Sequence, residues 1–179
     1  ITRGFDYDHP VLIDALPAVG KSRGVVKWAV KTGKPVTVFT ARHDLYDDYL
    51  DWCESFGADM DRVKRLPAFH HDCPTARDTD NHGDQWKKRI RREYNRGRSG
   101  AEIHERSKQL FGERLPCQQE GQCSYMADRQ YDSDDYDILI GHYSHAYSWK
   151  PTAGRYIVFD EFPENDFLVE FESSDLART

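Results

Sequence analysis

Short apolar runs alternate with amphipathic segments along the first third of the chain. The runs near 11–14, 36–40 and 63–68 are rich in β-branched and aliphatic residues, which is typical of buried strands. Apolar residues at helical spacing mark one segment that ends near Lys31 and another over 44–56. This alternation predicts a mostly parallel sheet with helices on both faces, the α/β class.

The alternation stops at about residue 70 and does not return before residue 134. This stretch is polar and shows no clear strand, but its pattern predicts two helices, at about 83–95 and 101–111. Ser99 and Glu102 at the start of the second helix have the spacing of a capping box. We therefore interpret 70–134 as an insertion.

Two further apolar runs follow the insertion. Residues 137–141 and 156–159 have the composition of buried strands. The predicted organisation is an α/β domain formed by 1–69 and 135–179, with a helical, cysteine-containing and basic subdomain inserted at 70–134.

Composition narrows the class of protein. The 179 residues are 38% hydrophobic and 31% charged, with a mean hydropathy of −0.83. No apolar run approaches the ~20 residues that span a bilayer, and no signal-like N-terminus is visible, so we expect a cytoplasmic protein without membrane contacts. Because the sequence starts with Ile1, we expect it to be cut from a longer chain. The net charge of −6 argues against nonspecific nucleic-acid binding by the whole surface.

Residues 15–22 read Ala-Leu-Pro-Ala-Val-Gly-Lys-Ser and lie between a predicted strand and a predicted helix. This is nearly a phosphate-binding P-loop, with Ala15 in place of the first glycine. Loop amides would surround the phosphates of ATP, an ammonium would reach the β- and γ-phosphates, and a hydroxyl would ligate Mg²⁺. The residues predicted for this site are Ala18, Val19, Gly20, Lys21 and Ser22.

A second part of the nucleotide site is predicted where the last strand ends. Residues 156–161 read Tyr-Ile-Val-Phe-Asp-Glu. Asp160 would hold Mg²⁺ through water, and Glu161 would orient and deprotonate the attacking water, so the predicted catalytic residues are Lys21, Asp160 and Glu161. Because ligands of open α/β sheets bind at the carboxyl ends of strands, one crevice could hold both motifs.

Four stretches in this order resemble the first RecA-like domain of superfamily 2 helicases of the DExD/H-box class. They lie at 15–22, 38–42, 136–143 and 158–161. The resemblance implies a P-loop NTPase fold of three α/β/α layers, in which ATP hydrolysis with Mg²⁺ drives movement on DNA. It also implies nucleic-acid contacts by the residues after two of the strands, namely Thr40, Arg42, His142 and Tyr143.

The chain departs from the helicase pattern in two respects. The acidic box is Asp-Glu-Phe-Pro rather than Asp-Glu-Ala-His, with Pro163 at the position that often couples ATP to the motor. A second RecA-like domain with its arginine finger is absent before Thr179, and the resemblance implies one in the full-length protein. Since such a finger contributes about 10³–10⁵ in rate, we expect weak hydrolysis by this chain alone.

Three of the four cysteines fall in the insertion. Repair helicases of the XPD/DinG type carry an iron–sulfur module between the same two motifs, and Cys73, Cys117 and Cys123 resemble its ligands. Alternatively, His70 or His71 would complete a Cys₃His zinc site. A zinc site, an iron–sulfur cluster and three unpaired thiols remain open, whereas Cys53 lies on the apolar side of a predicted helix and is expected in the core.

Residues 86–98 hold seven basic residues and one acid, a local reversal of sign in an acidic protein. Phosphate contacts combined with stacking on Trp86 and Tyr94 would suit a single nucleic-acid strand. The alternative is a solvated helix face that pairs with the abundant acids. The residues predicted to contact nucleic acid are Lys87, Lys88, Arg89, Arg91 and Arg92.

These observations favour an ATP-dependent helicase or translocase that acts on single-stranded or forked DNA, with RNA as a second candidate partner. Two other functions fit parts of the pattern. One is another P-loop nucleic-acid motor, such as a terminase ATPase. The other is a metal-stapled nucleic-acid-binding module with a vestigial nucleotide site.

Overall fold

The computed structural model describes residue 11 and residues 20–77, 83–121 and 123–160. The strand predicted at 11–14 lies almost entirely outside these ranges, as do residues 15–19 of the predicted P-loop. The chain divides into two compact units. We call residues up to 65 and from 132 the sheet unit, and residues 66–131 the helical unit. Within the described ranges, every helix is too short or too polar to cross a membrane.

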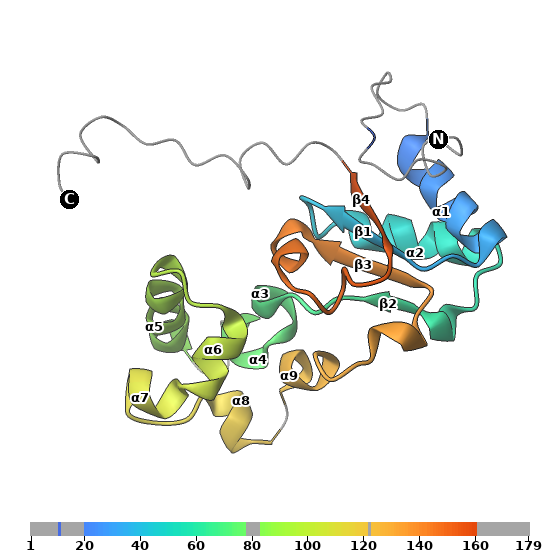
Figure 1. Cartoon of the computed structure of the whole chain (residues 1–179). Coiled ribbons are helices and arrows are strands. Elements are labelled where there is room, and N and C mark those ends of the chain that lie inside the picture. Colours follow the sequence, from blue (N-terminus) through green and yellow to red (C-terminus); the bar gives the residue numbers. More distant parts are fainter. Residues whose placement is uncertain (1–10, 12–19, 78–82, 122, 161–179) are drawn as a thin grey trace, which may run out of the picture. The chain divides into compact units, whose positions relative to one another are not determined.

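The sheet unit contains four parallel strands (Figure 1). Their spatial order is β2-β3-β1-β4. The sheet confirms the α/β class and the parallel arrangement. The strands are β1 (Val36–Thr40), β2 (Val63–Arg65), β3 (Ile138–His142) and β4 (Tyr156–Asp160).

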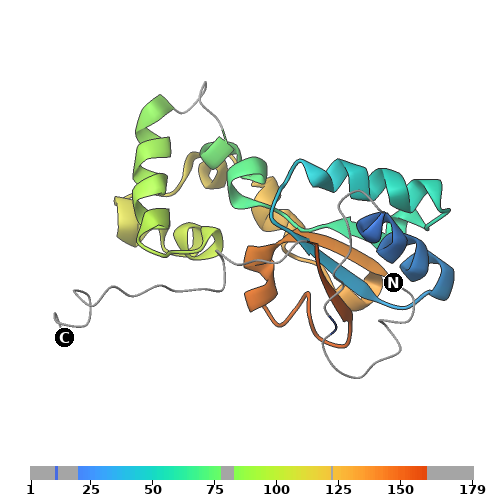
Figure 2. The ribbon, with the colours of Figure 1, turned by 90° about the horizontal axis from the view of Figure 1, so that it is seen from above.

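Helices α1 (Lys21–Thr32) and α2 (Leu45–Ser55) lie together along one face of this sheet (Figure 2). Their apolar sides bury alternate strand residues, for example Val38 of β1 and Ile140 of β3, in a single core. This is the side-chain alternation expected of strands covered by amphipathic helices.

The opposite face of the sheet differs from the prediction. Among the described residues it is covered by the 3₁₀ helix η4 (Tyr143–Tyr147) and the segment that follows, rather than by an α-helix. Tyr143 packs edge-on against Phe159, and the Thr37 hydroxyl donates to the Pro151 carbonyl. The described residues therefore establish an α/β fold compatible with a RecA-like domain, without the second helical layer.

The helical unit consists of short helices around its own core. The predicted helix over 83–95 is confirmed as α5, whereas the one predicted over 101–111 is broken at Arg106 into α6 and α7. Four helices of four or five residues were not predicted, because one turn is too short to show a period. The bounds are α3 (Phe69–Asp72), α4 (Pro74–Arg77), α5 (Gly83–Asn95), α6 (Gly100–Glu105), α7 (Ser107–Phe111), α8 (Pro116–Gln119) and α9 (Ser124–Asp128). Two further 3₁₀ turns, η2 (Met60–Arg62) and η3 (Ser133–Asp135), belong to the sheet unit.

Candidate functional site

Three residues predicted from separate motifs end neighbouring strands at one edge of the sheet. The register pairs Thr40 of β1 with His142 of β3 on one side and with Asp160 of β4 on the other. All three strands run parallel, so this row is the carboxyl edge, where open α/β sheets place their ligands.

The amino end of α1 reaches the same edge. Gly20 precedes the helix with φ of 78°, a left-handed conformation that glycine adopts without strain. Two residues later, the Ser22 hydroxyl donates a hydrogen bond of 2.6 Å to Oδ1 of Asp160. Thus two residues predicted to share a Mg²⁺ ion, 138 positions apart in the chain, are in contact.

Two tyrosines fix Asp160 from the other side. The Tyr49 hydroxyl donates to Oδ2 of Asp160 at 2.7 Å, and the Tyr143 hydroxyl donates to its backbone carbonyl. Burial of Tyr49, followed by the negative charge of Asp160, raises the pKa of this phenol well above its usual value. Tyr49 therefore stays protonated and holds the carboxylate in one orientation, a role that the sequence did not indicate.

The other predicted residues of this unit have different surroundings. Thr40 is buried, and its hydroxyl accepts from the Arg42 amide. The exposed Arg42 guanidinium pairs with Asp44, and the His142 ring stacks on His43 with centroids 4.9 Å apart. Lys21 is the first residue of α1. Ala18, Val19 and Glu161 lie outside the described residues.

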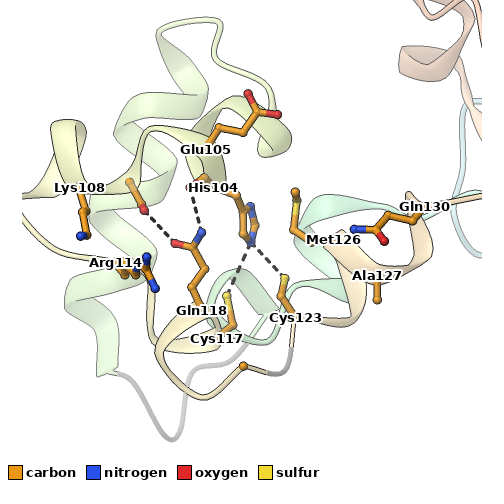
Figure 3. Close-up of a pocket in the computed structure, with 12 residues that line it drawn as sticks. His104, Glu105, Lys108, Arg114, Cys117, Gln118, Cys123, Met126, Ala127 and Gln130 are labelled. Carbon is orange, nitrogen blue, oxygen red and sulfur yellow. Dashed lines mark hydrogen bonds between the residues drawn. The ribbon is translucent and has the colours of Figure 1, made fainter.

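The helical unit contains a cluster of four groups that could hold a metal ion. Cys73, His104, Cys117 and Cys123 each direct one ligand atom toward a common point, with all four atoms within 4.8 Å of one another. The first three are buried and Cys123 is half-buried. Figure 3 shows His104 between the sulfurs of Cys117 and Cys123. The three predicted cysteines are therefore brought together.

The histidine of this cluster is not one of those predicted. His70 and His71 lie on α3 with exposed side chains, whereas His104 of α6 is 1% exposed and contacts the sulfurs. His104 stands 13 positions before Cys117, within a predicted helix, so its spacing gave no metal-site signal. Its side chain reaches the cysteines because α6 contacts α3 through Phe69 and α8 through Cys117 and Gln118.

The orientation of the His104 ring is fixed by its neighbours. Nδ1 donates to the Gly100 carbonyl at 2.7 Å, since a carbonyl can only accept, and this leaves Nε2 as the ring nitrogen that faces the sulfurs. The side-chain amide of Gln118 donates to the His104 carbonyl at 2.9 Å (Figure 3). Gly100 is required here because a Cβ at this position would lie 2.5 Å from Cγ of Phe69.

The three sulfurs perturb one another's protonation. Hydrogen bonds from Cys123 and Cys73 lower the pKa of the Cys117 thiol far below its ordinary range. Hydrogen bonds to Cys117 and Cys123 raise the pKa of Cys73, whose thiol remains protonated. Burial opposes the charged form of His104, but its contacts with Cys117 and Cys123 raise its pKa to about 10. The cluster thus favours a thiolate at its centre, the form of cysteine that binds metals.

A cavity of about 590 Å³ adjoins this cluster (Figure 3). Three of the four groups line it, namely His104, Cys117 and Cys123, together with the basic residues Lys108 and Arg114. Cys123, the half-buried member of the cluster, is therefore the ligand closest to solvent.

The basic stretch over 86–98 divides into two sets. One set pairs with acids or carbonyls: Arg89 bonds Glu113 and the Phe111 carbonyl, while Arg96 and Arg98 bond the buried carboxylate of Glu93 at 2.8 and 3.0 Å. Burial alone would raise the pKa of Glu93, but Arg98, Arg96 and Arg92 lower it.

Trp86 is also structural, because it packs against Phe111 beneath the Arg89 guanidinium. This part matches the alternative of a helix face that pairs with acids.

The second set is Lys87, Lys88 and Arg91, which are exposed and form no ion pair with any described residue. Tyr94 is 42% exposed on the same helix, and its ring meets His70 edge-on with centroids 4.6 Å apart. Lys87, Arg91 and Tyr94 follow one another at spacings of four and three residues on α5, so they share one side of that helix. Partial burial, His71 and the charges of Arg91 and Lys87 lower the pKa of His70. We call Lys87, Arg91, Tyr94 and His70 the cation–aromatic face.

Comparison with known proteins gives no relative. No protein-family model matches the chain, and searches of curated proteins and of solved structures find no significant match.

Proposed function

We propose that the sheet unit binds ATP with Mg²⁺ and hydrolyses it to drive movement of the protein on nucleic acid. The observation that carries this proposal is the 2.6 Å hydrogen bond between Ser22 and Asp160 at the carboxyl edge of a parallel sheet. Two ligands at adjacent corners of a Mg²⁺ octahedron lie about 3 Å apart, so these oxygens fit one ion with little movement. The hard oxygen atoms are also the ligands that Mg²⁺ prefers.

Each residue would have a separate task in hydrolysis. Lys21 and the α1 amino terminus neutralise the phosphates, and Ser22 and Asp160 hold the ion, which would offset charge on the β- and γ-phosphates. Tyr49 is a positioning residue, since it donates to the Asp160 oxygen that Ser22 does not contact. Glu161 follows Asp160 in the chain and would take the proton of the attacking water.

The partner we propose is a single nucleic-acid strand. The cation–aromatic face offers two cations that form no ion pair with a described residue, together with an exposed ring for a base, in a chain whose net charge is −6. Four other arginines of the basic stretch form ion pairs within the helical unit, namely Arg89, Arg92, Arg96 and Arg98. The proposed nucleic-acid contact surface is therefore smaller than the basic stretch.

The test is ATP binding and hydrolysis by the full-length protein with and without a DNA strand. Lys21→Ala should abolish turnover, and Glu161→Gln should retain ATP without turnover. Lys31→Ala is a matched control, because this lysine is exposed in the last turn of the same helix. Unchanged turnover in Lys21→Ala would refute the nucleotide site.

A second candidate function is a metal-containing nucleic-acid-binding module that does not use ATP. The clustering of the three cysteines with His104 favours it. Tight binding of single-stranded DNA by a protein that binds no ATP would establish this alternative in place of the motor.

A further inference from the structure

We propose that Cys73, His104, Cys117 and Cys123 hold a single zinc ion in a closed tetrahedral site, and not the iron–sulfur cluster that the helicase resemblance implies. The inference concerns the helical unit alone and stands whether or not the sheet unit hydrolyses ATP.

The distances between ligand atoms have the size that one ion requires. With Zn–S bonds of about 2.3 Å and Zn–N bonds of about 2.0 Å, tetrahedral angles separate two sulfurs by about 3.8 Å and a sulfur from a nitrogen by about 3.5 Å. The Cys73 and Cys117 sulfurs are 3.8 Å apart, and they lie 3.5 and 3.6 Å from Nε2 of His104.

The fourth ligand needs a small adjustment. The Cys123 sulfur is 3.1 Å from Nε2 of His104, which is about 0.4 Å less than the tetrahedral separation. Cys123 precedes α9 and is the least buried of the four, so its side chain can move without disturbing the core. The three separations among Cys73, His104 and Cys117 thus match one shared metal, and the Cys123 sulfur lies within 4.8 Å of the other two sulfurs.

An iron–sulfur cluster does not fit the same residues. Its irons and sulfides would have to occupy the space between the ligands, whereas the Cys73 and Cys117 sulfurs are in contact. Both side chains are fully buried in the core of the helical unit, so separating them would open that core. The ligand set also differs, because clusters are ordinarily held by four cysteines or by two cysteines and two histidines.

The ligand set also indicates a structural rather than a catalytic zinc. Four protein ligands complete the tetrahedron, so the ion would have no position for water or substrate even though the 590 Å³ cavity adjoins it. Instead the ion joins α3, α6, α8 and α9, helices of four to six residues. Helices this short are not stable alone in water. Binding of a shared metal would therefore contribute folding free energy that their own hydrogen bonds do not provide.

The first experiment uses the unmodified full chain. Protein purified without oxygen should contain about one zinc per chain and neither iron nor acid-labile sulfide. Replacement of zinc by Co²⁺ should give the intense visible bands of tetrahedral cobalt together with thiolate-to-cobalt charge transfer in the near ultraviolet. Iron and sulfide in cluster proportions, a weak octahedral cobalt spectrum, or failure to bind either metal would each overturn the proposal.

The second experiment tests the identity of the ligands. His104→Ala should weaken zinc affinity by more than about 100-fold, whereas His104→Cys should keep the metal and shift the cobalt bands toward those of four thiolates. The matched controls, the double variant His70→Ala/His71→Ala and the single variant Cys53→Ser, should bind zinc as the unmodified chain does. Loss of zinc from the His70/His71 variant, or unchanged cobalt bands in His104→Cys, would contradict the assignment.

Discussion

Ser22 and Asp160 are joined by a 2.6 Å hydrogen bond although 138 positions separate them in the chain. One lies in the first turn of α1 and the other ends β4. The contact places a hydroxyl and a carboxylate at the carboxyl edge of the sheet and is the basis of the nucleotide-site predictions.

If this pair shares a Mg²⁺ ion, Ser22→Ala and Asp160→Asn should each lower Mg²⁺-dependent ATP hydrolysis by about 100-fold or more, because a charge-stabilising ligand is lost. Ser22→Thr keeps the hydroxyl and should retain activity. Steady-state hydrolysis against Mg²⁺ concentration measures both effects. Ser55→Ala, an exposed serine at the end of α2, is the control; equal activity of Asp160→Asn and the unmodified protein would exclude the shared ion.

The raised pKa of Tyr49 predicts a loss of stability in alkali. Below pH 10.0 both folded and unfolded Tyr49 are protonated, and above it the phenol ionises in the unfolded chain but stays protonated in the folded one. The free energy of unfolding should therefore fall as the pH rises above about 10. Urea denaturation between pH 8 and 11 measures this fall.

Tyr49→Phe separates this effect from other alkaline changes. The variant should be less stable near neutral pH by about 1–3 kcal/mol, since Asp160 loses a donor. Its stability should also fall less steeply above pH 10 than that of the unmodified protein. Identical slopes for the two proteins would show that Tyr49 does not cause the fall.

Gly100→Ala tests the packing that orients His104. The added methyl would lie 2.5–2.7 Å from Phe69 atoms, so α6 or the Phe69 ring must shift. We expect a loss of about 1–3 kcal/mol in stability and weaker zinc retention. Chelator competition and urea unfolding measure these changes. Glu105→Ala, an exposed substitution on the same helix, should leave both unchanged.

Charge reversal tests the cation–aromatic face. Lys87→Glu/Arg91→Glu should weaken binding of single-stranded DNA and reduce the slope of log affinity against log salt by about 1.4, or 0.7 for each lost phosphate contact. Fluorescence anisotropy at several salt concentrations provides the slope. Arg106→Glu/Lys108→Glu makes the same charge change elsewhere in the helical unit, and an equal loss in this control would show a general charge effect.

The aromatic part of the same face needs its own variants. Tyr94→Ala should weaken single-strand binding by about 1–3 kcal/mol through loss of stacking, whereas Tyr94→Phe keeps the ring and should bind normally. The same titration measures both. Normal binding by Tyr94→Ala would exclude stacking at this position.

The strands and long helices could be predicted because their signals are local. Val36–Thr40 and Tyr156–Asp160 are short apolar runs, and α2 and α5 are long enough to show a helical period. The break at Arg106 and the short helices α3, α4, α8 and α9 could not be predicted, because at one turn the backbone follows tertiary packing.

By itself the sequence determined the α/β class, the parallel sheet and the identity of the three clustered cysteines. Only the tertiary structure decided which histidine joins those cysteines, which arginines are neutralised by Glu93, and that Tyr49 holds Asp160. Periodicity depends on neighbours along the chain, whereas a ligand set or an ion pair depends on atoms that folding brings within a few ångströms. His104 illustrates this, since neither its position in the chain nor its neighbours in sequence distinguish it from His70 or His71 until α6 packs against the cysteines.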